Sequence, residues 1–232
     1  MVEINQILGR LKTKYSPKKG TGYLASWEKR AMDVVASSLM LPFAIPLIGL
    51  LAGVKYLEDG ENPFFVLAPH DFSPRKIKIR SMSSDARTKE DALLEGRPYA
   101  EYKSTRKGQD PRITKFGRLL RKSSLDEIPQ IWQIFLGEIS MVGPRFFETD
   151  FEQALIPKSE TEDSYAKLLE IYRAQRIKPG VFGNFTLFGR GDMTLDERVK
   201  VELDYLKNAS FWGDIAIIAR CLPISLQRKG AY

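Results

Sequence analysis

The longest apolar stretch of the chain runs from Val34 to Val54, and none of its 21 residues carries a charge. A run of this length can cross a bilayer. Pro42 and Pro46 interrupt it, and a proline inside a helix removes a backbone hydrogen bond and bends the axis. Ser37 and Ser38 are expected to bond the backbone groups that such a bend frees.

Cations flank this run on both sides, at Lys29, Arg30 and Lys55. The positive-inside rule therefore does not favour opposite faces for its two ends. A bent, re-entrant helix that enters and leaves on the cytoplasmic face satisfies both the prolines and the charges. A simple span and a buried helix of a soluble protein are the alternatives. Asp33 would be costly at the membrane unless it is paired, and we expect its partner to be Lys29 or Arg30.

Shorter patterns predict the elements that follow. Residues 64–67 read as a short strand, and the alternation of Lys76–Met82 predicts a strand with one basic face, either solvated or in contact with phosphates. Helices are predicted at 83–97, 113–121, 131–136, 165–176, 195–208 and 211–226; in the basic amphipathic 113–121 segment, Ile113, Phe116, Leu119 and Leu120 face inward. The expected fold class is mixed α/β, mostly helical, with a small globular domain and few strands.

Composition narrows the chemistry. The 232 residues carry a formal net charge of +7, which favours phosphate-bearing partners such as nucleic acid, anionic lipid or nucleotide. A single cysteine, Cys221, excludes an internal disulfide, and a single histidine, His70, excludes a histidine-rich metal site. Any metal would therefore be bound by oxygen, so Mg²⁺ or Mn²⁺ is favoured over zinc.

Two adjacent carboxylates, Asp126 and Glu127, follow a run of cations and precede an apolar segment. At a helix N-terminus beside arginines, such carboxylates are expected to stay ionised at neutral pH. That suits a nucleophile or a metal ligand handling a phosphate. The structural alternative is helix capping, either as a capping box of Ser124 with Glu127 or with Asp126 as the cap and Pro129 in the first turn.

Further candidates follow the dyad. Gly143 and Pro144 are expected to form a tight turn that presents Arg145, whose guanidinium suits bidentate contact with phosphate oxygens. Residues 178–183 form a rigid loop of small residues, in which a ligand could approach the backbone. Arg190 lies in a second glycine-rich turn.

Taken in their order along the chain, these motifs resemble those of the bacterial monotopic phosphoglycosyl transferases, the undecaprenyl-phosphate sugar-1-phosphate transferases. The resemblance covers residues 29 to 232. Its longest match is the stretch from Asp110-Pro111-Arg112 to Asp126-Glu127-Ile128-Pro129-Gln130. The other matching stretches are Lys29-Arg30 with Asp33, Lys78–Met82 with Asp85, Gly143-Pro144-Arg145, Lys178–Gly183 with Gly189-Arg190, and Gly230-Ala231-Tyr232.

The resemblance implies a two-step reaction. With Mg²⁺ bound at the dyad, Asp126 would attack the phosphate attached to the sugar of a UDP-sugar, giving a covalent phosphosugar–aspartyl intermediate and UMP. Undecaprenyl phosphate would then take the phosphosugar. Glu127 would hold the metal or tune the site. Arg145 would clamp the phosphate with support from Arg80, Arg121 and Lys78, while Pro179, Gly180, Gly183 and Arg190 would lie near the nucleotide-sugar.

The resemblance also implies a place and a division of the chain. The protein would act on the cytoplasmic face of the bacterial inner membrane, as a minimal form of the family, with a homodimer and downstream glycosyltransferases as further partners. Residues 1–28 would be an interfacial or mobile basic segment, residues 29–57 the re-entrant helix, and residues 58–232 a cytosolic catalytic domain with interfacial helices.

The chain departs from the family pattern at three points. The family's Ser-Pro bend is Ile45-Pro46 here, Phe146 replaces a usual proline, and Asn184–Leu187 lacks the usual Trp-Gln pair. Two rival functions are a membrane-anchored binding protein of the same fold without catalysis and a nucleic-acid-binding module. The uncharged run and the lack of a nucleic-acid motif argue against the latter, and a single hydrophobic segment argues against a multi-spanning transferase.

Overall fold

The computed structural model describes residues 22–67, 74–86, 88–89, 110–145, 177–188 and 195–226. Over these ranges the chain is mostly helical and has two small two-stranded sheets, which confirms the coarse fold class. The predicted helix 165–176 lies outside the described residues, as do most of the predicted helix 83–97 and most of the basic segment 1–28.

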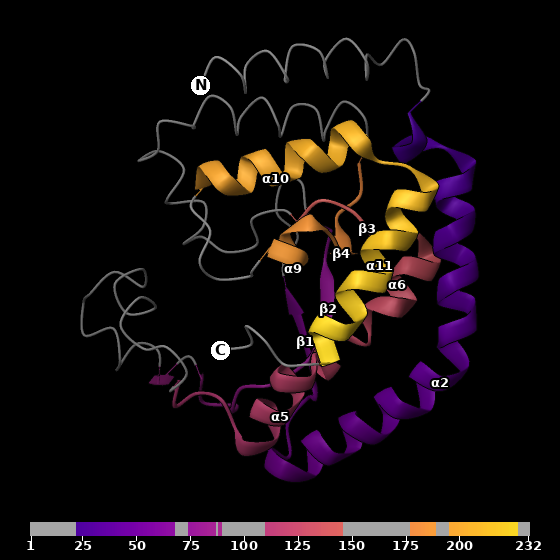
Figure 1. The fold of residues 1–232 in the computed structure, drawn as a ribbon. Helices are drawn as coiled ribbons and strands as arrows, with labels where there is room; N and C mark the ends of the chain where they lie inside the picture. Colours follow the sequence, from indigo (N-terminus) through magenta and orange to yellow (C-terminus); the bar gives the residue numbers. More distant parts are fainter. Residues whose placement is uncertain are drawn as a thin grey trace.

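The dominant element is helix α2, Trp27–Asp59, which follows a single 3-10 turn at Tyr23–Ala25. The Ser26 side chain caps its start, and Gly60 ends it in the left-handed conformation. Figure 1 shows α2 running along one side of the molecule and then turning beneath it. Both prolines of the apolar run lie inside the helix. Within the described residues, α2 is the one helix whose length and composition would allow it to cross a membrane.

The expected role of the helix serines is wrong. Ser37 donates to the carbonyl oxygens of Asp33, at 2.6 Å, and Val34, at 3.2 Å. A proline removes the hydrogen bond to the carbonyl four residues earlier, so Pro42 and Pro46 affect the carbonyls of residues 38 and 42 instead. Ser37 therefore bonds carbonyls that lie about one turn before those that the prolines free, and the Ser38 side chain is exposed to solvent.

The strands form two pairs. Strands β1, Phe64–Leu67, and β2, Lys76–Ile79, are antiparallel, and β3, Ser140–Val142, pairs in parallel with β4, Gly180–Phe182. The first strand has the predicted bounds. The predicted second strand ends at Ile79, with Met82 forming an isolated bridge to Ile113.

The remaining helices are short, apart from the last two. Helices α10, Leu195–Asn208, and α11, Phe211–Leu226, have the predicted bounds. Leu119 was predicted to face inward, but its side chain is 50% exposed; only Leu120 of that pair enters the core. The others are α5, Lys115–Ser123, the 3-10 turn Leu125–Glu127, α6, Gln130–Leu136, and α9, Asn184–Phe188.

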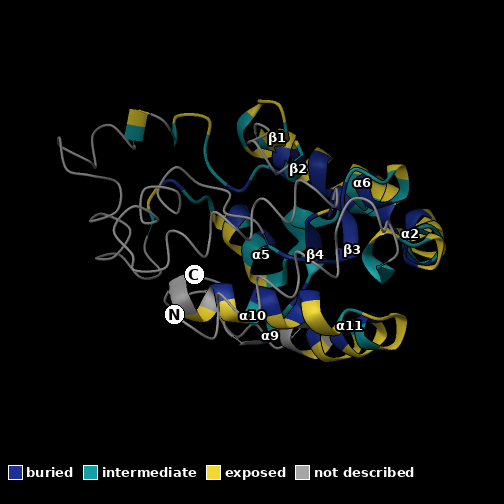
Figure 2. Cartoon of the chain, turned by 90° about the horizontal axis from the view of Figure 1, so that it is seen from above, coloured by how far each residue is buried: buried dark blue, intermediate teal, exposed yellow. Residues whose placement is uncertain are grey.

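Two buried hydrophobic clusters hold these elements together. The larger joins α6, β3, α10 and α11 through Ile134, Ile139, Met141, Val142, Tyr205, Ile217 and Cys221. The smaller joins α2, β2 and α5 through Leu51, Ile79 and Leu120. Figure 2 shows that the outward sides of α2 and α11 stay exposed. Large apolar side chains lie on those sides, including Leu39, Phe43, Leu50, Leu57, Phe211 and Trp212.

Candidate active site

The chain reaches the two carboxylates through a sharp change of direction at the end of α5. Ser124 adopts the left-handed conformation, with φ of 55°, and its N–H donates to the Arg121 carbonyl at 3.2 Å. A residue in this conformation cannot serve as an N-cap, which needs extended backbone. No side-chain cap bond forms at Ser124 or before α6. The capping interpretations of Asp126 and Glu127 are therefore wrong.

The turn that carries the dyad rests on the smaller hydrophobic cluster. Leu125 and Ile128, which flank Asp126 and Glu127, pack against that cluster together with Leu47 of α2. Burial of these flanking side chains fixes the turn against α2, β2 and α5. The dyad is therefore supported directly by the helix that carries the uncharged run.

Two cations surround the dyad. The Lys78 ammonium of β2 lies 2.9 Å from Glu127 Oε1, and the Arg121 guanidinium donates to the Ser81 hydroxyl at 2.7 Å. Burial and the neighbouring Glu127 charge raise the pKa of Asp126 to about 6, although Lys78 and Arg121 oppose that shift. Asp126 is thus mainly ionised at pH 7, as expected, but its pKa is raised rather than held low by the cations.

Arg80, the fourth predicted phosphate-binding cation, lies on the same basic strand face and is turned toward the end of α2. Its guanidinium pairs with Asp59 at 2.7 Å and donates to the Asn62 carbonyl at 2.9 Å. Lys55 also pairs with Asp59, at 3.0 Å. In this structure Arg80 anchors the C-terminal end of α2 to β2.

A second group of predicted residues gathers around β3 and β4. Gly180 and Gly183 both pack against the backbone of Gly143. A Cβ added to Gly180 would lie 2.0 Å from the Gly143 nitrogen, and one added to Gly183 would lie 2.6 Å from the Gly143 carbonyl oxygen. The small side chains thus allow close backbone packing, and no turn forms at Gly143. Pro179 is buried and accepts from the Ser140 N–H at 2.9 Å. Contact of this loop with a nucleotide-sugar stays a prediction.

The predicted phosphate clamp, Arg145, follows β3. Its guanidinium lies 5.6 Å from the ring centre of Phe185 in α9, and its N–H donates to Glu202 of α10. Arg145 therefore belongs to the β3–β4 side of the domain, whereas Lys78 and Arg121 flank the dyad. Arg190 lies outside the described residues.

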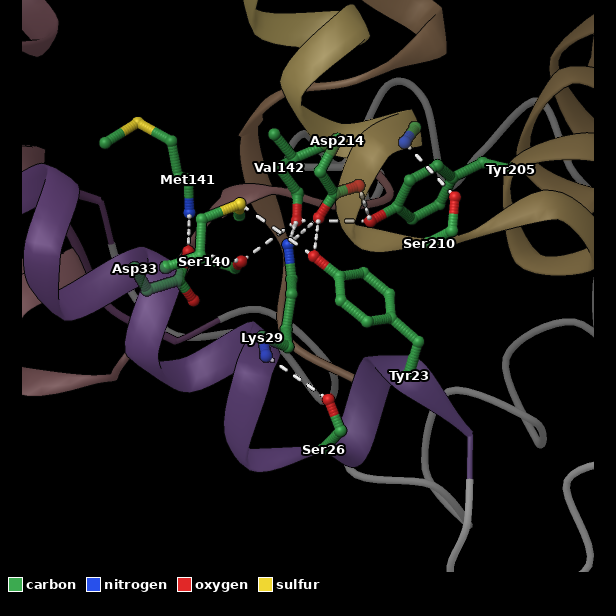
Figure 3. Close-up of polar contacts among 12 residues, drawn as sticks. Tyr23, Ser26, Lys29, Asp33, Ser140, Met141, Val142, Tyr205, Ser210 and Asp214 are labelled. Carbon is green, nitrogen blue, oxygen red and sulfur yellow. Dashed lines mark hydrogen bonds and ion pairs between the residues drawn. The ribbon is translucent and has the colours of Figure 1, made fainter.

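The N-terminal end of α2 is fixed by a buried charged network (Figure 3). The Lys29 ammonium pairs with Asp214 of α11 at 2.5 Å and donates to the Val142 carbonyl at 2.6 Å. The hydroxyls of Tyr23 and Tyr205 donate to the same carboxylate at 2.9 and 3.1 Å. Burial raises the pKa of Asp214, and the Lys29 ammonium opposes that shift.

Asp33 has different partners from those expected. Its carboxylate accepts from the Ser140 hydroxyl at 3.0 Å and from the Met141 N–H at 2.8 Å, so its pairing with Lys29 or Arg30 was wrongly predicted. Arg30 instead donates to the Ile134 and Phe135 carbonyls at 2.8 and 2.6 Å. Both carbonyls lie in the last turn of α6, where carbonyls lack partners four residues further along the helix; that of Ile134 also accepts from the Gly137 N–H at 2.9 Å.

The network residues Tyr23, Tyr205 and Asp214 were missed as a group. The available signal was Asp214, a lone carboxylate in an apolar helix, since such a charge needs a partner. Nothing in the sequence indicated that this partner would be Lys29, which lies 185 positions away.

The donor set at the dyad fits a hard divalent cation only in part. Among the residues that the structure describes, no group of three or more His, Cys, Asp or Glu side chains could hold a metal. Asp126 and Glu127 offer two oxygen-donor carboxylates. Mg²⁺ is commonly held by one or two carboxylates, with substrate phosphates and water completing its coordination.

The fold and site define a class: a protein that has, in the part of the chain described, one apolar helix of membrane-spanning length docked on a small domain whose adjacent carboxylates lie among cations. The family model described as bacterial sugar transferase matches residues 24–228. The chain belongs to the bacterial sugar transferase family.

Individual relatives agree with this assignment. The UDP-galactose-lipid carrier transferase of Erwinia amylovora is 34% identical over 215 residues, and the exopolysaccharide production protein ExoY of Rhizobium meliloti is 33% identical over 215. The undecaprenyl-phosphate galactose phosphotransferase of Salmonella typhimurium is 34% identical over 210. Each match covers 88% of this chain. The matched region spans 88% of ExoY but only 41% of the other two proteins.

The raised pKa of Asp126 predicts a pH-dependent stability difference. Its pKa is about 3.9 in an unfolded chain and about 6 when folded, so the folded state binds the extra proton between these values. Wild-type stability therefore falls as pH rises through this window. In magnesium-free detergent solution, we expect Asp126→Asn to be more stable than wild type by about 1–3 kcal/mol at pH 7.5.

Thermal unfolding at pH 4 and pH 7.5 measures this difference. The gain in Tm should be present at pH 7.5 and nearly absent at pH 4. At pH 4 the wild-type carboxyl is protonated in the folded state and about half protonated in the unfolded chain. An equal Tm for both proteins at pH 7.5, or a lower Tm for the variant, would contradict the burial of an ionised Asp126.

Proposed function

We propose that this protein transfers a sugar-1-phosphate from a UDP-sugar to undecaprenyl phosphate and releases UMP. The functions for which the Erwinia and Salmonella relatives are named support this reaction type. The observation that carries the proposal is the dyad itself: two carboxylates without a capping role, flanked by Lys78 and Arg121 and seated on the membrane-type helix.

In the first step the Asp126 carboxylate attacks the phosphorus attached to the sugar. The bond from that phosphorus to the UMP oxygen breaks, and UMP leaves with the bonding electrons. In the second step an oxygen of undecaprenyl phosphate attacks the same phosphorus and displaces Asp126, which regains its carboxylate. Two steps allow one compact site to take a soluble and a lipid substrate in turn.

The cations act on the charge of the phosphates. Lys78 and Arg121 flank the carboxylate that attacks, where they offset repulsion between it and the diphosphate. Arg145 is proposed as the clamp on phosphate oxygens from the β3 side, because a guanidinium can bond two of them at once. Asp126 and Glu127 would hold Mg²⁺, which neutralises phosphate charge as the leaving group departs.

We further propose that α2 is re-entrant and places the site at the cytoplasmic face of the bacterial inner membrane. Both ends of α2 are tied to the same domain, through Lys29 and Asp214 at the start and through Asp59 and Arg80 at the end. A straight helix of this length would measure about 50 Å, against about 30 Å for the hydrocarbon core. The bend in Figure 1 and the shared anchorage support a helix that returns to the face it entered.

Labelling of two variants, each with one added cysteine, tests this topology. Glu28→Cys and Glu61→Cys place an exposed thiol at the two ends of α2, and the native Cys221 is fully buried. We expect both to react with a membrane-impermeant maleimide in inside-out vesicles and neither in spheroplasts. Labelling of the two variants from opposite sides would establish a spanning helix instead.

Release of UMP tests the reaction. Purified protein in nanodiscs should release UMP from one member of a panel of UDP-sugars when undecaprenyl phosphate and Mg²⁺ are present. Asp126→Asn should lower the rate by at least about 10³-fold, and a chelator should stop release until Mg²⁺ is restored.

The outcomes separate the alternatives. Equal release by Asp126→Asn would leave the transferase standing and contradict the aspartyl route. UDP-sugar binding without UMP release would favour a non-catalytic binding protein of the same fold.

A further inference from the structure

The side chain of Gln133, in the middle of α6, is fully buried and uses its whole amide group. Its Oε1 accepts from the Ile77 N–H of β2 at 2.9 Å. Its Nε2 donates to the Arg75 carbonyl at 2.5 Å and to Glu138 Oε2 at 2.7 Å. The amide orientation is unambiguous, because the oxygen faces a donor and the nitrogen faces two acceptors.

These bonds join the two segments that form the dyad site. Residues 125–127, 128 and 129 are in right-handed helical conformation and lead directly into α6, so Glu127 and Gln133 lie on one continuous piece, about 9 Å apart along its axis. On the other segment, Lys78 directly follows Ile77. The Lys78–Glu127 ion pair and the Gln133 hydrogen bonds therefore connect the same two segments at separate points.

The two connections differ in strength. The side chains of Lys78 and Glu127 are 22% and 18% exposed, and an ion pair with solvent access contributes only about 0–1 kcal/mol. Lys78 must also exchange Glu127 for phosphate oxygens if it serves the transfer. The Gln133 side chain is 0% exposed, so loss of these bonds would leave its own buried amide atoms unpaired, at about 1–3 kcal/mol each, whereas Ile77 is half-buried and Arg75 is exposed.

We propose that Gln133 is a positioning residue, which fixes β2 against the dyad-bearing segment so that Lys78 stays beside Asp126 and Glu127. This inference rests on the proposed transferase function. Gln133 touches no substrate, since its side chain is enclosed by β2 and Glu138. Its effect is to hold the spacing between the attacking carboxylate and its cation while Lys78 changes partners.

Three variants isolate the contribution of the Gln133 hydrogen bonds. Gln133→Glu has nearly the same shape and keeps the acceptor for Ile77, but it loses both donors and places a second carboxyl group beside Glu138. Glu138→Gln is the matched control, because its remaining oxygen can still accept from Gln133. The double variant removes the carboxyl clash and lets the new amide at position 138 donate to the new carboxylate at position 133, which should rescue part of the loss.

Two measurements test these variants, both made at a temperature well below the Tm of each variant. The first is kcat and KM for UMP release. The second needs no activity: the yield of a zero-length carbodiimide crosslink between Lys78 and Glu127, measured by peptide mass spectrometry without nucleotide. For Gln133→Glu we expect a fall of about 10–100-fold in kcat, a change in KM of less than about threefold, and a severalfold lower crosslink yield. Glu138→Gln should match wild type, and the double variant should recover both readouts in part.

A different pattern would overturn the inference. If Gln133→Glu lowers only the Tm, with kcat and crosslink yield unchanged, Gln133 is an ordinary core residue. If wild type releases no UMP, the transferase proposal fails separately, and an unchanged crosslink yield in Gln133→Glu would then refute the positioning role. If Gln133→Glu does not fold, Gln133→Asn, which is one methylene shorter, is judged by the same two readouts.

Discussion

The buried pair of Lys29 and Asp214 is the constraint on which the arrangement of α2 depends. Removing two charges from water costs several kcal/mol per ion, and only close pairing with further hydrogen bonds compensates for it. Here the Val142 carbonyl and two tyrosine hydroxyls complete the set. Lys29 and Asp214 can meet only if the start of α2 is docked across β3 and against α11, so the pair specifies that docking.

Docking of α2 has consequences for the dyad at its other end. Arg30 fixes the end of α6, and Leu47 and Leu51 support the turn before it. The apolar helix and the candidate site are thus held together by direct contacts. This arrangement would suit the proposed reaction with a lipid phosphate, whose depth in the membrane is fixed, because a helix that set this depth would also support the turn with the proposed nucleophile.

Local patterns were sufficient for much of the fold. The bounds of β1, α10 and α11 followed from periodicity and turn residues, and the grouping of Lys78 and Arg121 with the dyad was expected from motif resemblance. Long-range pairing was not predictable. The local pattern suggested Ser124 as a cap, but the left-handed conformation that excludes this role depends on how α5 ends. The partners of Asp33 come from β3, and Gln133 bonds Ile77 of β2 and Arg75 beside it, which only the folded chain brings near.

Mass spectrometry of the protein incubated with its UDP-sugar and Mg²⁺ in the absence of undecaprenyl phosphate tests the central claim most directly. The account predicts that the peptide containing Asp126 gains the mass of one phosphosugar, and that addition of undecaprenyl phosphate removes it. A modified peptide elsewhere in the chain, or full UMP release with no modified peptide at any time, would contradict Asp126 as the nucleophile.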